Sequence, residues 1–306
     1  MPKGTKVLIT IPAYNEEATI SILINDIKNI LNDKYNYKIL VIDDGSTDKT
    51  ASIAKEAEVI VHSHNRNYGL AETFRTEMQH VAGSDADIIV HIDADGQYLA
   101  QDIPKLIQKI EEGYDLVLGS RFTGQIEDMP LVKRIGNKAF SRAISKIIGT
   151  KITDAQTGFR AFKKEIALLK ISSTHTYTQE QIIRAAKQKY KIVEVPIYFA
   201  RRRYGKSRLI QNPFEYAIKA WINVLRVYRD YEPLKFFGRI GLYLIAISFL
   251  ILIYLVLTLY TNGIGILDEE IPTIILAVVI FLTGLQILFF GFLADRPPNA
   301  SEDVRH

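Results

Sequence analysis

The stretch DIIVHIDADGQY, residues 87–98, decides how the fold is interpreted. Its apolar run Ile88-Ile89-Val90 predicts a buried strand. The chain then leaves this strand through two aspartates one residue apart, Asp93 and Asp95. A buried strand has no need of two carboxylates at its end. The pair therefore predicts a site for a charged ligand.

Strands and helices alternate on both sides of this stretch. Apolar runs predict strands over residues 6–15, 38–46, 58–63, 87–95 and 115–121. Segments with helical periodicity separate them, over residues 16–31, 47–57, 70–82 and 99–113. Strands that are apolar throughout and joined by single helices predict an α/β fold, with a mainly parallel sheet covered on both faces. Ligands of such sheets bind beyond the carboxyl ends of the strands.

Acidic side chains lie at the ends of three of the predicted strands. They are Glu16 at the end of the first strand, Asp43 and Asp44 at the end of the second, and Asp93 and Asp95 at the end of the fourth. Because parallel strands end at one edge of the sheet, we expect these carboxylates to converge on one crevice. Concentrated carboxylates repel each other unless a cation or a hydrogen-bonded ligand compensates them.

Bulk properties and missing motifs exclude several classes of protein. The 306 residues include 38 Lys and Arg and 34 Asp and Glu, a net charge of +4 that is too balanced for a general nucleic-acid binder. The chain has no cysteine, which excludes disulfides and thiolate metal sites. No G-x-G-x-x-G follows the first strand, and no P-loop sequence occurs, which argues against dinucleotide oxidoreductases and P-loop nucleotidases. The carboxylates instead fit Mg²⁺ or Mn²⁺, which bind carboxylates together with substrate phosphates.

The composition changes after about Arg239. Residues 240–260 and 271–294 contain no charged side chain. At 1.5 Å per residue the first run spans roughly 30 Å, the thickness of a bilayer core. The two runs predict a transmembrane hairpin. The alternative is a pair of buried helices in a soluble protein, which two runs without an ionisable residue do not favour.

Flanking charges predict the orientation of this hairpin. Basic residues lie outside it, at Lys235, Arg239 and Arg296, whereas the connecting loop carries only acidic charges. The positive-inside rule then places both termini in the cytoplasm. Residues 211–239 show helical spacing of apolar and aromatic side chains around Trp221, which predicts an amphipathic helix at the membrane interface; an ordinary core-facing helix is the alternative.

These segments define the expected organisation of the chain. We expect a cytoplasmic catalytic domain over residues 1–210, a juxtamembrane segment over 211–239, a hairpin over 240–294 and a cytoplasmic tail over 295–306. A two-helix hairpin buries little surface by itself, which makes further copies of the chain a candidate partner.

Six sequence motifs occur in a familiar order. They are IPAYNEE at residues 11–17, VIDDGSTDKT at 41–50, DADGQY at 93–98, GSRF at 119–122, DAQTGFRAF at 154–162 and VEVPIYFARRRYGKSRL at 193–209. The series resembles the inverting family-2 glycosyltransferases of the GT-A fold. The later motifs resemble the polyprenyl-phosphate branch, which includes the dolichyl-phosphate mannose synthases. The resemblance covers about residues 5–210.

The resemblance implies a nucleotide pocket at the first two acidic strand ends. Pro12, Tyr14 and Glu16 would line the pocket for the base and the ribose. Asp44, with Asp43 beside it, would accept hydrogen bonds from the base.

The resemblance also implies a metal site at the third acidic strand end. Asp93 and Asp95 would bind Mg²⁺ or Mn²⁺, which holds the donor diphosphate, and Gln97 would assist. Further residues would close over this diphosphate, namely Arg202, Lys206 and Ser207.

The acceptor side is expected to involve three more residues. Asp154 matches the family's candidate general base, and a helix N-cap is the alternative role for it. A phosphate acceptor hardly needs a base, because its second pKa is about 6. Asp154 would then orient other groups. Arg121 and Arg134 would contact the phosphate of the lipid.

The expected reaction is therefore transfer of one sugar, with inversion, from a nucleotide diphosphate sugar to a polyprenyl phosphate. It would occur at the cytoplasmic face of the cell membrane or of an ER-type membrane. UDP-glucose, UDP-N-acetylglucosamine and GDP-mannose all remain open as donors, with the resemblance of QTGFRAF favouring UDP. Two alternatives remain. A processive polysaccharide synthase would carry Q-x-x-R-W, and here Gln181 and Arg184 are followed by Ala185. A non-catalytic scaffold would have lost the aspartates or arginines, and none is missing.

Overall fold

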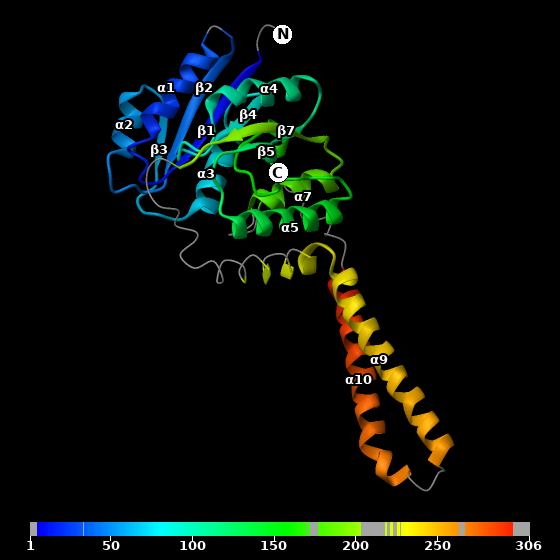
Figure 1. The fold of residues 1–306 in the computed structure, drawn as a ribbon. Helices are drawn as coiled ribbons and strands as arrows, with labels where there is room; N and C mark the ends of the chain where they lie inside the picture. Colours follow the sequence, from blue (N-terminus) through cyan, green and yellow to red (C-terminus); the bar gives the residue numbers. More distant parts are fainter. Residues whose placement is uncertain are drawn as a thin grey trace. The chain divides into compact units, whose positions relative to one another are not determined.

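The computed structural model describes residues 5–32, 34–169, 171, 177–202, 218, 221–222, 225–226, 228–262 and 267–295. The chain divides into two compact units, Met1–Ala220 and Trp221–His306. The predicted boundaries at residues 210, 239 and 294 stay predictions. Figure 1 shows the elements of both units.

The described residues of the first unit form seven strands and the helices around them. The strands are β1 Lys6–Ala13, β2 Asn36–Asp43, β3 Ile60–Ser63, β4 Ile88–His91, β5 Leu116–Ile126, β6 Arg160–Lys163 and β7 Ile192–Phe199. The helices are α1 Ile20–Leu31, α2 Thr50–Glu56, α3 Leu70–Ala82, the 3₁₀ turn η1 Ala100–Asp102, α4 Ile103–Glu111, α5 Leu131–Ile148, α6 Lys164–Ala167 and α7 Tyr177–Lys187.

All seven strands form one sheet in the order β3-β2-β1-β4-β6-β5-β7. Neighbouring strands run parallel except at β6, which is antiparallel to both β4 and β5. The predicted α/β class with a mainly parallel sheet is confirmed. The predicted strand 115–121 continues to Ile126, and β6 and β7 complete the sheet beyond the five strands predicted from apolar runs.

Helices pack on the sheet through apolar stripes. In α1 the residues Ile20, Leu23, Ile24, Ile27 and Leu31 are buried, a spacing of three and four that places them on one helix face. They join alternate residues of β1 in the main core. Each buried aliphatic side chain of this kind stabilises the fold by about 1.5–3 kcal/mol. Helix α3 contacts β1 and β2.

Parallel pairing brings the acidic strand ends together. Ala13 at the end of β1 lies opposite Asp43 at the end of β2, and Thr10 of β1 lies opposite His91 of β4. Backbone hydrogen bonds continue past the strands, from Asp44 N to Ala13 O at 2.8 Å and from Ile92 N to Thr10 O at 3.0 Å. The carboxylates that follow β1, β2 and β4 therefore meet at one edge of the sheet.

The described residues of the second unit include two long apolar helices, α9 Pro233–Asn262 and α10 Leu267–Ala294. Within them Pro233–Thr261 and Glu270–Ala294 are long and apolar enough to cross a membrane, judged by length and composition. Both predicted apolar helices are confirmed, and the first begins at Pro233, before the predicted Ile240.

Small residues let these two helices pack closely. A Cβ atom added to Gly241 would lie 2.6 Å from the carbonyl oxygen of Gly284, closer than any side chain tolerates. The Ser248 hydroxyl donates a hydrogen bond to the Ala277 carbonyl at 2.8 Å. Hydrogen bonding of this kind between helices is typical of membrane hairpins.

Part of the predicted amphipathic segment, residues 211–217, 219–220, 223–224 and 227, lies outside the described residues. Of the described positions, Trp221, Ile222 and Leu225 are exposed. The interfacial role of this segment stays a prediction.

Candidate active site

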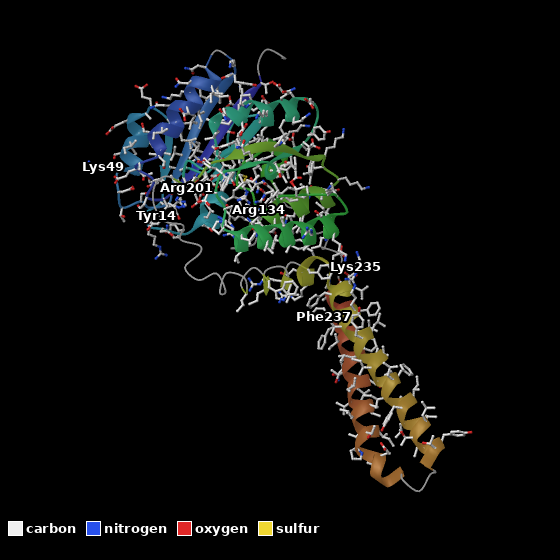
Figure 2. All side chains as sticks on the ribbon, viewed as in Figure 1. Tyr14, Lys49, Arg134, Arg201, Lys235 and Phe237 are labelled. Atoms are coloured by element: carbon white, nitrogen blue, oxygen red, sulfur yellow. The ribbon has the colours of Figure 1, made fainter. Side chains whose placement is uncertain are left out.

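A cavity of about 360 Å³ opens at the edge where β1, β2 and β4 end. Seven predicted site residues line it, namely Pro12, Tyr14, Glu16, Asp44, Asp93, Asp95 and Arg202. Larger cavities lie elsewhere among the described residues, one at the amino ends of β1 and β2, one beside α5 and one between the start of β4 and the end of α4, but none of the three contains an acidic strand end. Figure 2 labels Tyr14, just past the end of β1, and Arg134 on α5.

Six lining residues were not predicted. Two of them, Ala13 and Ala94, are direct neighbours of predicted residues, and the other four belong to the turn before α3 and to its first turns, namely Asn67, Gly69, Leu70 and Thr73. The signal that could have found them is the sequence NYGL at residues 67–70, which follows the third strand and contains a glycine at positive φ.

Asp93 and Asp95 lie side by side on the cavity wall and remain partly accessible. Their side chains are 29% and 19% exposed. Burial, and next the charge of Asp93, raise the pKa of Asp95 to about 6. A Cβ atom added to Gly158 would lie only 2.4 Å from Oδ2 of Asp93, so glycine is required where residues 157–159 pass this carboxylate. The two aspartates thus repel each other in a confined space, which a cation would relieve.

Arg202 lies beside two acidic residues of the cavity wall, Glu16 and Asp95. Its Nη2 donates to Oε1 of Glu16 at 2.8 Å, and its Nη1 lies 3.8 Å from Oδ2 of Asp95. The cavity therefore carries a guanidinium beside the carboxylate pair. Lys206 and Ser207, predicted to act with Arg202, lie outside the described residues.

Gln97 ties the aspartate turn to the end of β7. Its backbone N–H donates to Oδ1 of Asp95 at 3.1 Å, and its side-chain amide donates to the Ala200 carbonyl at 3.3 Å. The Ala200 N–H in turn donates to the Gln97 carbonyl at 2.8 Å. This link positions the chain that carries Arg202, two residues further on. A role for Gln97 as metal ligand stays a prediction.

Asp44 organises the loop that closes one side of the cavity. Its carboxylate is buried and accepts hydrogen bonds from the backbone N–H groups of Tyr68 at 2.9 Å and Gly69 at 2.8 Å. It also contacts Nδ1 of His64 at 2.8 Å. Asp43 is likewise buried and accepts from the Ser46 N–H at 3.1 Å. The predicted contact of these aspartates with a nucleotide base stays a prediction.

Arg121 and Asp154 form a buried, bidentate ion pair. The guanidinium donates through Nε to Oδ2 at 2.7 Å and through Nη2 to Oδ1 at 2.8 Å. The side chains are 5% and 0% exposed. The Arg121 backbone N–H also donates to Oδ2, at 3.0 Å. Both oxygens of Asp154 are therefore engaged by Arg121.

Helix α5 carries two neighbouring cations in different surroundings. Arg134, predicted to contact the lipid phosphate, is exposed. Burial, and next the charge of Arg121, lower the pKa of Lys133, while Asp95 acts in the opposite sense. Lys133 therefore lies within the electrostatic field of the site, which the sequence alone did not indicate.

A second buried charged pair, Glu77 and His91, lies next to Asp93. His91 contacts Oε2 of Glu77 through Nδ1 at 2.7 Å, and both side chains are fully buried. Nε2 of the same imidazole lies 3.7 Å from Oδ1 of Asp93. Burial acts to lower the pKa of His91, but the charges of Glu77 and Asp93 outweigh it and raise the pKa to about 9.

The site has few protein ligands for a metal ion. Within the part of the chain that the structure describes, no three His, Asp or Glu side chains are grouped to hold one. Asp93 and Asp95 supply hard oxygen donors of the kind Mg²⁺ and Mn²⁺ prefer. Such ions commonly take one or two carboxylates and complete their shell with water and substrate phosphates. The residues present fit this arrangement.

Comparison with known proteins identifies close sequence relatives. The chain is 30% identical over 301 residues to the glycosyltransferase AglJ of Haloferax volcanii, covering 96% of this chain and 94% of the relative. It is 34% identical over 229 residues to the UDP-N-acetylglucosamine--dolichyl-phosphate N-acetylglucosaminyltransferase of Methanococcus voltae, covering 66% and 88% of the two chains.

The fold also matches solved structures. Glucosyl-3-phosphoglycerate synthase from Mycobacterium tuberculosis, solved with Mn²⁺, UDP-glucose and phosphoglyceric acid, superposes with a TM-score of 0.57 at 21% identity. The match covers 72% of this chain and 80% of that one. It supports the predicted GT-A fold.

The family model for glycosyl transferase family 2 matches residues 8–168, just over half of the 306 residues. This range contains the first acidic strand ends, the aspartate pair and the buried Arg121–Asp154 pair. The predicted family and enzyme class are confirmed. The chain therefore belongs to glycosyl transferase family 2 and is a glycosyltransferase.

Proposed function

We propose that this enzyme transfers one sugar, with inversion, from a nucleotide diphosphate sugar to a polyprenyl phosphate of the dolichyl type. The observation that carries the proposal is the cavity that places Asp93, Asp95 and Arg202 together. Carboxylates and a guanidinium on one wall suit a metal-bound diphosphate. The acceptor class is supported by the relatives, among which one is named a dolichyl-phosphate N-acetylglucosaminyltransferase and another a dolichyl-phosphate hexose transferase.

The donor would be held through its phosphates and its nucleoside. Asp93 and Asp95 would ligate Mg²⁺ or Mn²⁺, which when bound neutralises the leaving nucleotide diphosphate as a Lewis acid. Arg202 would exchange Glu16 for a phosphate oxygen, because a guanidinium fork matches phosphate geometry. Pro12 and Tyr14 would border the nucleoside.

The donor's base and sugar are a finer part of the proposal. We favour a uridine nucleotide, which the resemblance of QTGFRAF and the name of the Methanococcus voltae relative both support. UDP-N-acetylglucosamine and UDP-glucose are the first donors to test, with GDP-mannose as the comparison.

The acceptor phosphate would approach from the side of Arg121 and α5. A phosphate monoester is largely dianionic at neutral pH, so it needs little help from a general base. Both carboxylate oxygens of Asp154 bind Arg121, which supports an orienting role for Asp154. Lys133 and Arg134 add positive charge on α5. Fixed charges of this kind stabilise a transition state without reorganisation.

We further propose that α9 and α10 anchor the enzyme in a membrane, with both termini and the catalytic unit on the cytoplasmic side. The length and composition of the helices support this, as do the basic residues Lys235, Arg239 and Arg296 that flank them in the sequence. Anchoring keeps the enzyme at the surface where a polyprenyl phosphate is confined and raises the local concentration of acceptor.

The processive alternative has less support. Gln181 is fully buried and accepts a hydrogen bond from Arg160 at 2.9 Å, while Arg184 pairs with Glu180 at 2.8 Å. Both positions of the partial Q-x-x-R pattern are thus used in packing α7.

A donor panel tests the proposal. Purified enzyme would be supplied with polyprenyl phosphate, Mn²⁺ or Mg²⁺, and each of the three labelled nucleotide sugars. We expect label to appear in a lipid with one sugar per chain, and only with a polyprenyl phosphate present. Asp95→Asn serves as the inactive control. Label in long water-insoluble polymer would favour the processive alternative, and no transfer from any donor would refute the proposal.

A further inference from the structure

Glu77 and His91 are two ionisable residues whose side chains are fully buried. Glu77 lies on α3 and His91 is the last residue of β4, and their contact of 2.7 Å joins the helix to the sheet. Beyond this contact, Nε2 of His91 and Oε1 of Glu77 have no hydrogen-bond partner among the described residues.

Stability alone does not account for this pair. Removing two charged groups from water costs several kcal/mol per group, and a well-packed apolar pair is often as stable or more stable. Phe74 of α3 packs edge-on against His91, with ring centroids 5.5 Å apart, so the surroundings suit an apolar side chain. A buried pair with unused polar atoms is therefore expected to serve a further purpose.

The unused nitrogen of His91 points to that purpose. It lies 3.7 Å from Oδ1 of Asp93, and no other described residue offers it a polar partner. On the opposite side, Oδ2 of Asp93 is so close to Gly158 that a Cβ atom there would lie 2.4 Å away. The carboxylate is thus confined between an imidazole and a backbone segment.

The Arg160 side chain binds that backbone segment through a hydrogen bond. Arg160 is the cross-strand neighbour of His91 and is fully buried. Its guanidinium donates to the carbonyl of Thr157, to the carbonyl of Thr178 and to Oε1 of Gln181. The loop that confines Asp93 is therefore fixed to α7, and the charged groups facing His91 are Glu77, Asp93 and Arg160.

We infer that His91, oriented by Glu77, is a positioning residue that fixes the Asp93 carboxylate for cation binding. The inference rests on the proposed metal site. In metal sites the groups that hydrogen-bond to the ligands orient them, and their loss typically weakens metal binding or activity about 10- to 100-fold. Here the chain Glu77–His91–Asp93 would act in this way.

The test uses the full chain in detergent and measures Mn²⁺ binding directly, from the paramagnetic resonance signal of the free ion during protein titration. The variants are Glu77→Gln, His91→Gln and the double variant. We expect each to bind Mn²⁺ about 10- to 100-fold more weakly. Matched controls are Glu72→Gln on the same helix and His62→Gln on β3, which should bind Mn²⁺ as the wild type does.

The double variant is decisive because a single substitution leaves one buried charge without its partner. If it folds and binds Mn²⁺ as the wild type does, the inference is wrong. If the double variant does not fold, the Glu77→Gln variant is used instead, because glutamine keeps the shape of the side chain and an oxygen that can accept a hydrogen bond from His91. Wild-type Mn²⁺ affinity of this single variant also overturns the inference.

Asp93→Asn and Asp95→Asn are measured in the same titration. If these variants lose Mn²⁺ while the Glu77 and His91 variants do not, only the positioning role is refuted. If the aspartate variants bind Mn²⁺ like the wild type, the proposed metal site is itself wrong.

Discussion

Asp154→Asn is expected to reduce both stability and transfer, for a reason that can be worked out from the structure. The substitution preserves volume but leaves the Arg121 guanidinium buried, with 5% of its side chain exposed, opposite a neutral amide. Breaking a buried ion pair by removing one partner costs about 3–5 kcal/mol. For a unit of this size, each kcal/mol lowers the unfolding midpoint by about 2–4 °C, so the midpoint should fall by about 6–20 °C.

The assay is thermal unfolding of the purified chain in detergent, followed by circular dichroism. Asp85→Asn provides the control, because Asp85 also forms an ion pair at 2.8 Å, with Lys6, but its side chain is 58% exposed. Exposed pairs contribute about 0–1 kcal/mol, so this control should shift the midpoint by less than about 4 °C.

A double variant, Arg121→Met with Asp154→Leu, separates stability from function. Replacing both charges by apolar groups removes the unpaired charge, so much of the lost midpoint should return while sugar transfer stays low. Asp154→Asn with a wild-type midpoint would refute the energetic reasoning. Recovered transfer in the double variant would refute the orienting role of the pair.

Further outcomes are expected elsewhere in the site and in the hairpin. Asp95→Asn should nearly abolish transfer with Mg²⁺ or Mn²⁺ while the circular dichroism spectrum is unchanged. Gly158→Ala, which puts a methyl group 2.4 Å from an Asp93 oxygen, should raise the Mn²⁺ concentration that gives half-maximal rate. Arg202→Ala should raise KM for the nucleotide sugar more than KM for the lipid, in kinetics that vary each substrate. A chain ending at Arg229 should bind nucleotide and use short prenyl phosphates better than long ones; equal rates would contradict anchoring.

The parts of the fold that could be predicted are those with a local signal. Strands such as β1 and β4 are mostly apolar runs, and the helix α1 has a regular apolar stripe. β6 has only the sequence RAFK, with a cation at each end. Its Arg160 is buried because carbonyl groups of Thr157 and Thr178 receive it, and those partners are known only once the chain has folded.

The candidate site likewise has features that the sequence could predict and features that it could not. Strand ends on one sheet edge follow from parallel pairing, so the meeting of Glu16, Asp44 and Asp93 could be expected. The Arg121–Asp154 pair joins residues 33 positions apart, and its geometry depends on how the loop after α5 packs against β5. Motifs indicated that both residues matter but not that each is the other's partner.

The contact between Glu16 and Arg202 has a consequence for turnover. Glu16 accepts a hydrogen bond from the Arg202 guanidinium at 2.8 Å, so a phosphate that binds this guanidinium must displace a carboxylate. With the proposed donor site, the net gain on binding would be the difference between two ion pairs, which would favour a multiply charged diphosphate over singly charged or neutral competitors. After transfer, the same carboxylate would compete for the guanidinium as the nucleoside diphosphate departs. Exchange of this partner at each cycle would then limit how tightly the product is retained and leave the site open to the next donor.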